Sequence, residues 1–153
     1  MIACIFAGHR EIVLRTDASV IPNRLRAALI DLINLDTEFQ FYFGGMGWFD
    51  LLCARTVRDV KVLHPEKRIR LILIQPYQRK IEEKNLYDEI LLLNESNNTD
   101  CGASIPERTR RLMERCHYMI AYVHRDSGGA AMMLRHASAS GLTIWNLATH
   151  SKV

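Results

Sequence analysis

The chain has 153 residues, of which 48% are hydrophobic and 24% are charged, and its formal net charge at pH 7 is +3. This length indicates one domain whose core is large enough to fold without disulfides or metals. The small net charge gives no bulk electrostatic argument for nucleic acid, so we do not expect nucleic acid as a partner. No apolar run approaches the roughly 18 residues of a membrane-spanning helix, and we expect no membrane association.

The N-terminal segment and the cysteines indicate a cytoplasmic protein. The apolar run that begins at Ile2 breaks at Gly8, which is too soon for a signal peptide, and no basic segment precedes it. The four cysteines are widely spaced, and those at 4, 53 and 116 fall on apolar faces where cysteine packs as a small hydrophobe. We predict no disulfide framework, no metal site and no cofactor.

The first half of the chain alternates apolar runs typical of buried strands with apolar stripes of helical period. Pro22 is expected in the first turn of the first helix. Pro65 follows the end of the second helix, where proline is common because it cannot continue a helix. The predicted strands are 2–7, 39–43 and 69–74, and the predicted helices are 22–33 and 49–63.

The second half begins with the least regular part of the sequence, residues 78–104. This part contains a polar, partly helical stretch to Tyr87, a short strand at 89–93 and a loop-like segment from Asn94. The elements predicted after it are a basic helix at 105–116, a strand at 118–123, a helix at 129–140 and a strand at 143–147. Strands alternating with helices predict an α/β fold, with three layers and a mostly parallel sheet.

Three glycine-containing motifs each follow a predicted strand. They are Gly8-His9-Arg10, Gly44 to Asp50, and Ser127-Gly128-Gly129. Ligands of parallel sheets bind beyond the carboxyl ends of the strands, where helix N-termini favour anions. We therefore expect these loops to meet in one anion-binding pocket, although glycines in such turns also serve backbone conformation alone.

Each candidate in these motifs has a structural alternative. Arg10 suits either a phosphate, through its guanidinium fork, or a surface ion pair. His9 either contacts a ligand or hydrogen-bonds the loop backbone. Gly45 and Gly47 either bring backbone close to a ligand or make a tight turn, and Asp50 either receives a ribose hydroxyl or caps the second helix.

Four motifs in this order resemble the SLOG superfamily, which unites the DprA/Smf proteins, the LOG-type proteins and small bacterial YpsA-like proteins of unknown function. The motifs are Phe6-Ala7-Gly8-His9-Arg10, Gly44-Gly45-Met46-Gly47-Trp48-Phe49-Asp50, Arg108 with Met113, and Ser127-Gly128-Gly129-Ala130-Ala131. The resemblance implies a single SLOG-like Rossmann domain over residues 1–148, followed by a short tail at 149–153. It also implies that the glycine turns bind a nucleotide or nucleotide-derived ligand, often as a sensor or regulatory domain.

The resemblance brings a catalytic alternative as well. LOG enzymes cleave the N-glycosidic bond of nucleoside monophosphates with an arginine before the late strand, which Arg108 matches, and a glutamate after a GGxGT turn. Here Ala131-Met132 stand in place of Gly-Thr, and Leu134 and Arg135 stand in place of the acidic residues. Leucine can neither stabilise an oxocarbenium ion nor activate water, so ligand binding is predicted ahead of a nucleotide N-glycosidase or deoxyribosyltransferase-like reaction, and catalytic residues stay unassigned.

Three further hypotheses follow from the resemblance. Trp48, where related members often have a small residue, either stacks on a base or narrows the pocket. LOG-like relatives tend to form dimers, so a homodimer is a hypothesis by analogy. Single-strand nucleic-acid binding of the DprA type would use the arginines of 108–115, but no aromatic residues interleave with them as in such grooves.

Overall fold

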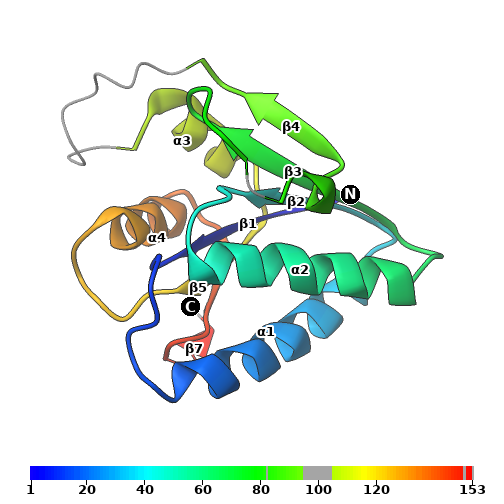
Figure 1. Cartoon of the computed structure of the whole chain (residues 1–153), viewed down its shortest axis with the longest axis horizontal. Coiled ribbons are helices and arrows are strands. Elements are labelled where there is room, and N and C mark those ends of the chain that lie inside the picture. Colours follow the sequence, from blue (N-terminus) through cyan, green and yellow to red (C-terminus); the bar gives the residue numbers. More distant parts are fainter. Residues whose placement is uncertain (82, 95–104, 150, 153) are drawn as a thin grey trace.

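The computed structural model describes residues 1–81, 83–94, 105–149 and 151–152. These residues form a seven-stranded sheet in the order β4-β3-β2-β1-β5-β6-β7. Neighbouring strands from β4 to β6 in this order run parallel, and β7 pairs with β6 in the antiparallel sense (Figure 1). The strands are β1 (Ile2–Gly8), β2 (Glu38–Phe43), β3 (Arg68–Gln75), β4 (Glu89–Leu92), β5 (Tyr118–Tyr122), β6 (Thr143–Asn146) and β7 (Ser151–Lys152).

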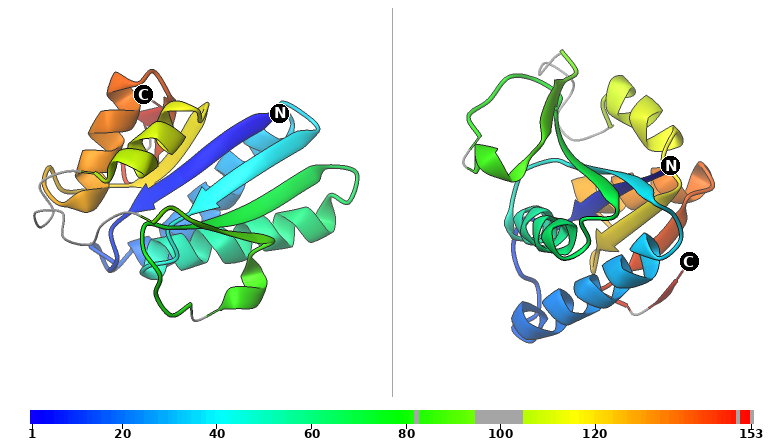
Figure 2. Two further views of the ribbon diagram at one scale, coloured as in Figure 1. Left: turned by 90° about the horizontal axis from the view of Figure 1, so that it is seen from above. Right: turned by 90° about the vertical axis from the view of Figure 1, so that its right-hand side faces the viewer.

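Helices cover both faces of this sheet, which gives three layers (Figure 2). One face carries α1 (Asp17–Ile33) and α2 (Trp48–Leu63), and the other carries α3 (Glu107–Glu114) and α4 (Gly129–Ala139). A short 3-10 helix, η1 (Lys84–Leu86), precedes β4. The predicted three-layer α/β domain with a mostly parallel sheet is therefore confirmed.

The central strand β1 separates two apolar cores. Cys4 and Phe6 face the core of α1 and α2, whereas Ala3 and Ile5 face the core of α3 and α4. Phe6 also stacks on Phe43 of β2, with ring centres 4.9 Å apart. Because both faces are covered, the strand is apolar at successive positions, which explains the unalternated run in the sequence.

The strand order reverses beside β1, because the chain builds outward through β2 and β3 on one side and through β5 and β6 on the other. At such a reversal the loops that follow the two central strands diverge, and a crevice forms beyond their carboxyl ends. The motifs that begin at Gly8 and Ser127 follow these two strands. The topology therefore places them at one edge of the sheet.

Some predicted boundaries differ from the structure. Helix α1 begins at Asp17, so Pro22 lies in its second turn and the expected first-turn position was wrong. The start is earlier because the Asp17 carboxylate accepts a hydrogen bond from the Leu14 backbone at 3.1 Å and fixes the first turn. β7, in the expected tail, was not predicted.

The segment predicted as partly helical contains the short 3-10 helix η1, and its other described residues form no helix. The short strand predicted after it is present as β4. Most of the loop-like segment that starts at Asn94, including Cys101, lies outside the described residues. Among the helices of the described chain, none has the length and apolar character to cross a membrane.

Candidate functional site

A cavity of about 310 Å³ opens at the carboxyl edge of the sheet. It lies where the chain leaves β1, β2 and β3 and where α3 and α4 begin. Each of the three glycine-containing motifs contributes to its lining. The lining residues from these motifs are Gly8, Arg10, Gly44, Met46, Asp50 and Gly129.

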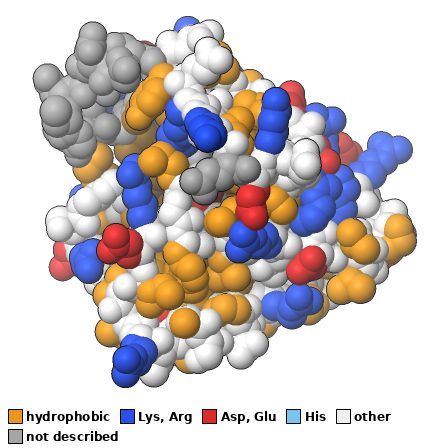
Figure 3. All heavy atoms as spheres, in the orientation of Figure 1, with side chains coloured by type: hydrophobic (Ala, Val, Ile, Leu, Met, Phe, Trp, Pro, Cys, Tyr) orange, Lys and Arg blue, Asp and Glu red, His pale blue; other side chains and the backbone are white. Residues whose placement is uncertain are grey.

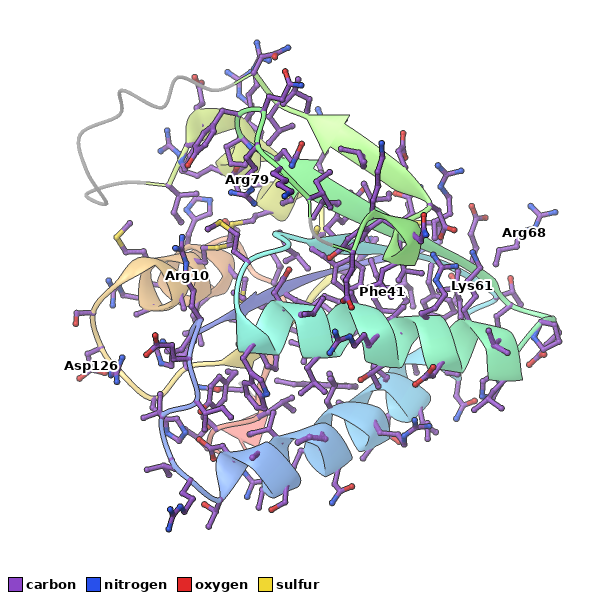
Figure 4. The ribbon with its side chains drawn as sticks, viewed as in Figure 1. Arg10, Phe41, Lys61, Arg68, Arg79 and Asp126 are labelled. Carbon is purple, nitrogen blue, oxygen red and sulfur yellow. The ribbon has the colours of Figure 1, made fainter. Side chains whose placement is uncertain are left out.

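Arg10 lines this cavity from the chain that leaves β1 (Figure 4). Its Nη2 atom lies 3.6 Å from the sulfur of Met46. Within the described part of the chain, no carboxylate forms an ion pair with Arg10, so the surface ion pair considered from the sequence is not observed there. A guanidinium keeps its charge in any surroundings and its charge is available to an anion.

The turn between β2 and α2 is held by the carboxylate of Asp50. The Gly44 amide donates to Asp50 Oδ1 at 3.1 Å, and the Gly45 amide donates to Oδ2. Asp50 is the third residue of α2, and no side chain caps this helix at Gly47. The carboxylate therefore fixes the preceding turn instead of serving as the N-cap of the helix.

The environment of Asp50 alters its acidity. Burial raises the pKa of Asp50 to about 6. The hydrogen bonds from the Gly44 and Gly45 amides and the charge of Arg79 lower the pKa, but burial has the larger effect. Asp50 is 8% exposed and is the only carboxyl group among the described residues that line the cavity. A buried, cavity-lining acid with a raised pKa is typical of functional sites.

Gly47 joins the first motif to the second. Its φ of +92° favours glycine, and a Cβ atom at this position would lie 2.5 Å from the Arg10 Cα. The next amide, that of Trp48, donates to the Arg10 carbonyl at 2.8 Å. Gly45, Gly47 and Trp48 line a separate cavity of about 170 Å³ beside α2 and not the main one.

Gly8 and His9 fix the loop that follows β1. Gly8 lines the cavity and has no room for a side chain, because a Cβ atom would overlap the Phe49 ring. His9 Nε2 accepts hydrogen bonds from the backbone amides of His124 at 2.9 Å and Arg125 at 3.3 Å. Burial, followed by the charges of Arg125 and His124, lowers the pKa of His9 and favours this neutral acceptor form. The structure thus shows the backbone-bonding alternative for His9.

Arg79 is a second guanidinium on the cavity, and no sequence motif identified it. It follows β3, and its Nη2 donates to the Gly44 carbonyl. Its guanidinium carbon lies 6.0 Å from the centre of the Tyr77 ring, and the Gln75 side chain donates to the Arg79 carbonyl at 3.2 Å. Arg79 was missed because residues 78–104 show no periodic pattern or glycine motif that would place this residue.

The third motif brings the start of α4 to the cavity. Gly128 has a φ of +96°, and Gly129 begins the helix and lines the cavity. The first amides of an α-helix have no acceptor within the helix, and its dipole makes this end favourable for anions. A Cβ atom at either glycine would meet no atom within 4 Å, whereas Ser127 and Gly128 are not part of the described lining.

Arg108, the arginine implied by the resemblance, is not among the residues described as lining the cavity. Its Nη1 donates to the carbonyl of Leu93, just beyond β4. The neighbouring Thr109 does line the cavity and is 6% exposed. Its hydroxyl oxygen is buried and has no hydrogen-bond partner in the described part of the chain.

Most of the remaining wall is apolar. It comes from the start of α3, from α4 and from the end of β3, and it includes Met132, Met133, Ile105, Pro106 and Ile74. Methionine adapts its shape and makes favourable contacts with aromatic rings. The wall therefore suits a flat or apolar ligand body beside the guanidinium groups.

A buried network behind the cavity fixes the roots of its loops. The Tyr122 hydroxyl donates to the Asp17 carboxylate and accepts from the Val13 amide at 2.8 Å, and His124 Nε2 lies 2.9 Å from the same carboxylate. Burial and the contact with Asp17 raise the pKa of Tyr122 to about 12. Trp48 packs edge-on against Tyr122, with ring centres 5.5 Å apart. No local sequence pattern indicates this network, because its members are distant in the chain.

The cysteines described by the structure are buried free thiols at positions 4, 53 and 116. Burial raises the pKa of each of these thiols, which keeps them protonated. Within residues 1–81, 83–94, 105–149 and 151–152, no group of three or more His, Cys, Asp or Glu side chains is placed to hold a metal ion.

The fold has a counterpart among solved structures. The crystal structure of TM1055, a structural-genomics target, superposes with a TM-score of 0.59 and 14% sequence identity, over 94% of this chain and 72% of that chain. This likeness shows a Rossmann-like fold. No protein-family model and no curated protein matches the sequence.

Proposed function

We propose that this chain is a SLOG-like domain that binds a nucleotide or nucleotide-derived ligand and acts as a sensor or regulatory domain. The observation that carries the proposal is the cavity in which Arg10, Arg79 and the first turn of α4 come together. Two guanidinium groups and a helix N-terminus give this space a positive potential. The ligand class that fits is an anion attached to a flat or apolar body.

The size of the cavity favours a small nucleotide. Ligand pockets range over roughly 300–1,000 Å³, and this cavity, at about 310 Å³, lies at the small end of that range. In our proposal the phosphate lies near Arg10 and Arg79, and the base lies against the methionines of α4.

Calorimetric titration with a panel of nucleoside monophosphates, nucleoside diphosphates and ADP-ribose tests the proposal. We expect at least one phosphate-bearing compound to bind and to raise the melting temperature. Arg10→Ala should weaken this binding, whereas Arg110→Ala, which removes an exposed arginine outside the described cavity lining, should not. A folded protein that binds none of these compounds would contradict the proposal.

Gly129→Leu provides an independent test. A side chain at this position has open space, because no atom lies within 4 Å of its Cβ, and Gly129 lines the cavity. We expect this variant to fold normally and to lose ligand binding by occlusion. Gly129→Ala is the matched control, since its single methyl group occupies little of the cavity.

Asp50 favours a second candidate function, cleavage or transfer at the N-glycosidic bond of a nucleotide. It is a buried carboxyl on the cavity, and its pKa of about 6 suits a general acid. Glu107 pairs with Arg111, Glu114 pairs with His136, and neither glutamate is part of the described lining. Chromatography after incubation with nucleoside monophosphates should then detect free base, and Asp50→Asn should abolish the release of the base. If the wild-type protein leaves the nucleotides intact, this function is excluded.

The remaining parts of the proposal concern partners and location. On the face drawn in Figure 3, basic and acidic side chains are interspersed, which supports a small-molecule ligand over nucleic acid there. A gel shift at low salt tests nucleic-acid binding. The homodimer and the cytoplasmic location stay hypotheses from the sequence, and light scattering after gel filtration measures the oligomeric state.

A further inference from the structure

We propose that Arg79 acts together with Arg10 to select a ligand with a terminal, doubly charged phosphate. The site would then take nucleoside 5′-monophosphates or diphosphates and reject cyclic nucleotides and nucleosides. This inference rests on the proposed function of the cavity. It adds a ligand class and a selective residue that lies outside every motif of the resemblance.

The two guanidinium groups reach the cavity from different parts of the sheet. Arg10 follows the central strand β1, and Arg79 follows β3, two strands away. In Figure 4 both lie toward the end of the molecule where α3 and α4 begin. Each contacts the turn between β2 and α2, Arg10 at the Met46 sulfur and Arg79 at the Gly44 carbonyl. The turn therefore contacts two guanidinium groups that line the same cavity.

Neither cation is neutralised by a carboxylate contact in the described chain. Arg79 contacts a carbonyl oxygen and lies 6.0 Å from an aromatic ring centre, and Arg10 contacts a sulfur atom. Asp50 is the described acid on the cavity, and its two oxygens already accept the amides of Gly44 and Gly45. Ionised Asp50, whose pKa the charge of Arg79 lowers, offsets part of this positive charge, so two guanidinium groups and one carboxylate leave the cavity with a net positive charge.

The number of N–H donors at the site indicates which class of phosphate it binds. A guanidinium presents five N–H donors, and Arg79 uses one nitrogen on the Gly44 carbonyl. A terminal phosphate offers three non-bridging oxygens and is largely doubly charged at neutral pH, since its second pKa is about 6. A cyclic phosphodiester offers two non-bridging oxygens and one charge. The terminal phosphate therefore satisfies two guanidinium forks and the first amides of α4 more fully.

Calorimetry near neutral pH with adenosine 5′-monophosphate, adenosine 5′-diphosphate, 3′,5′-cyclic adenosine monophosphate and adenosine tests the inference. We expect the terminal phosphates to bind at least about 10-fold more tightly than the cyclic compound. Arg79→Ala should weaken binding of the monophosphate by about 10- to 100-fold and that of the cyclic compound by less than about 3-fold. Arg110→Ala is the matched control and should change neither affinity.

Arg79→Lys guards against a purely structural effect, because lysine keeps the charge and a donor for the Gly44 carbonyl while losing the fork. Its affinity for the monophosphate should fall between those of the wild type and Arg79→Ala at an unchanged melting temperature. Nucleotide binding that is equal for cyclic and terminal phosphates, or that is unaffected by both Arg79 variants, would overturn the inference and leave the proposed function standing. Absence of binding to any nucleotide would overturn both.

Discussion

The two glycine turns of this domain look alike in sequence and differ in structure. The turn at Gly44–Gly47 makes several contacts with the rest of the protein. The Asp50 carboxylate accepts from the Gly44 and Gly45 amides, Arg79 donates to the Gly44 carbonyl, and Gly47 lies close to the backbone of Arg10. The turn at Ser127–Gly129 is open, and a Cβ atom at Gly128 or Gly129 would meet no atom within 4 Å. We call them the fixed turn and the open turn.

The difference shows that a glycine pair after a strand has two separate uses. In the fixed turn, glycine is needed at positions 45 and 47, because a Cβ atom there would meet Leu73 or the backbone of Arg10. In the open turn, the space beside Gly129 and the first amides of α4 face the cavity, so a ligand has room to approach. Four predictions, in descending order of expected effect, test this comparison.

Gly47→Ala should reduce the free energy of unfolding by roughly 2–4 kcal/mol, because the new Cβ atom meets the Arg10 backbone at a φ of +92°. Gly129→Ala should change it by less than about 0.5 kcal/mol, since that position is open and has no positive φ. Urea unfolding followed by circular dichroism measures both values. Equal losses in the two variants would contradict the distinction between the turns.

Asp50 should make the fixed turn sensitive to pH. Its pKa is raised to about 6 from an ordinary value of 3.8, so the folded state holds the proton more tightly than the unfolded state does. Ionisation between about pH 4 and pH 7 therefore costs stability, by up to roughly 3 kcal/mol. Wild type should lose this amount relative to Asp50→Asn over that range in urea unfolding, and a pH-independent difference between the two proteins would contradict the assignment.

Tyr122→Phe tests how firmly the strand before the open turn is held. The change leaves the Val13 amide without its acceptor and removes a donor to buried Asp17, so we expect a loss of about 2 kcal/mol in the free energy of unfolding. Tyr42→Phe is the matched control, because its hydroxyl donates to the partly exposed Gln40 and water replaces that bond. The control should lose less than about 1 kcal/mol.

Thr109→Val should have the smallest effect on stability. It removes a buried hydroxyl that has no partner in the described chain, so the ligand-free protein should gain up to about 1 kcal/mol. Thr56→Val, which breaks a 2.7 Å hydrogen bond to the Leu52 carbonyl, should lose stability instead. A destabilised Thr109→Val variant would show that the hydroxyl already has a partner.

The fold could be read from the sequence because its signals are local. The unalternated run at 2–7 and the helical stripe ending at Ile33 each reflect burial of neighbouring residues, and both were located to within a few positions. The start of α1 was misplaced because it depends on Asp17, whose carboxylate accepts from the Leu14 amide and also contacts the distant Tyr122 and His124. Such a contact leaves no periodic signal.

The candidate site was only partly predictable for the same reason. Motif and topology together placed Gly8, Arg10, Asp50 and Gly129 on one cavity. Arg79 and Thr109 belong to no recognisable motif. Their positions on the cavity depend on how β3 and α3 pack at the edge of the sheet. Nor does the sequence distinguish glycines that make a fixed turn from those that leave space for a ligand.

The cavity draws its walls from widely separated parts of the chain, from Gly8 near the start to Met133 in α4, and from helices on both faces of the sheet. A molecule seated there would act as a non-covalent cross-link between the two halves of the domain. At a concentration one hundred times its Kd it would add about 2.7 kcal/mol to the free energy of unfolding. If a nucleotide binds as we propose, its occupancy would therefore slow global unfolding and proteolysis, and both effects are measurable.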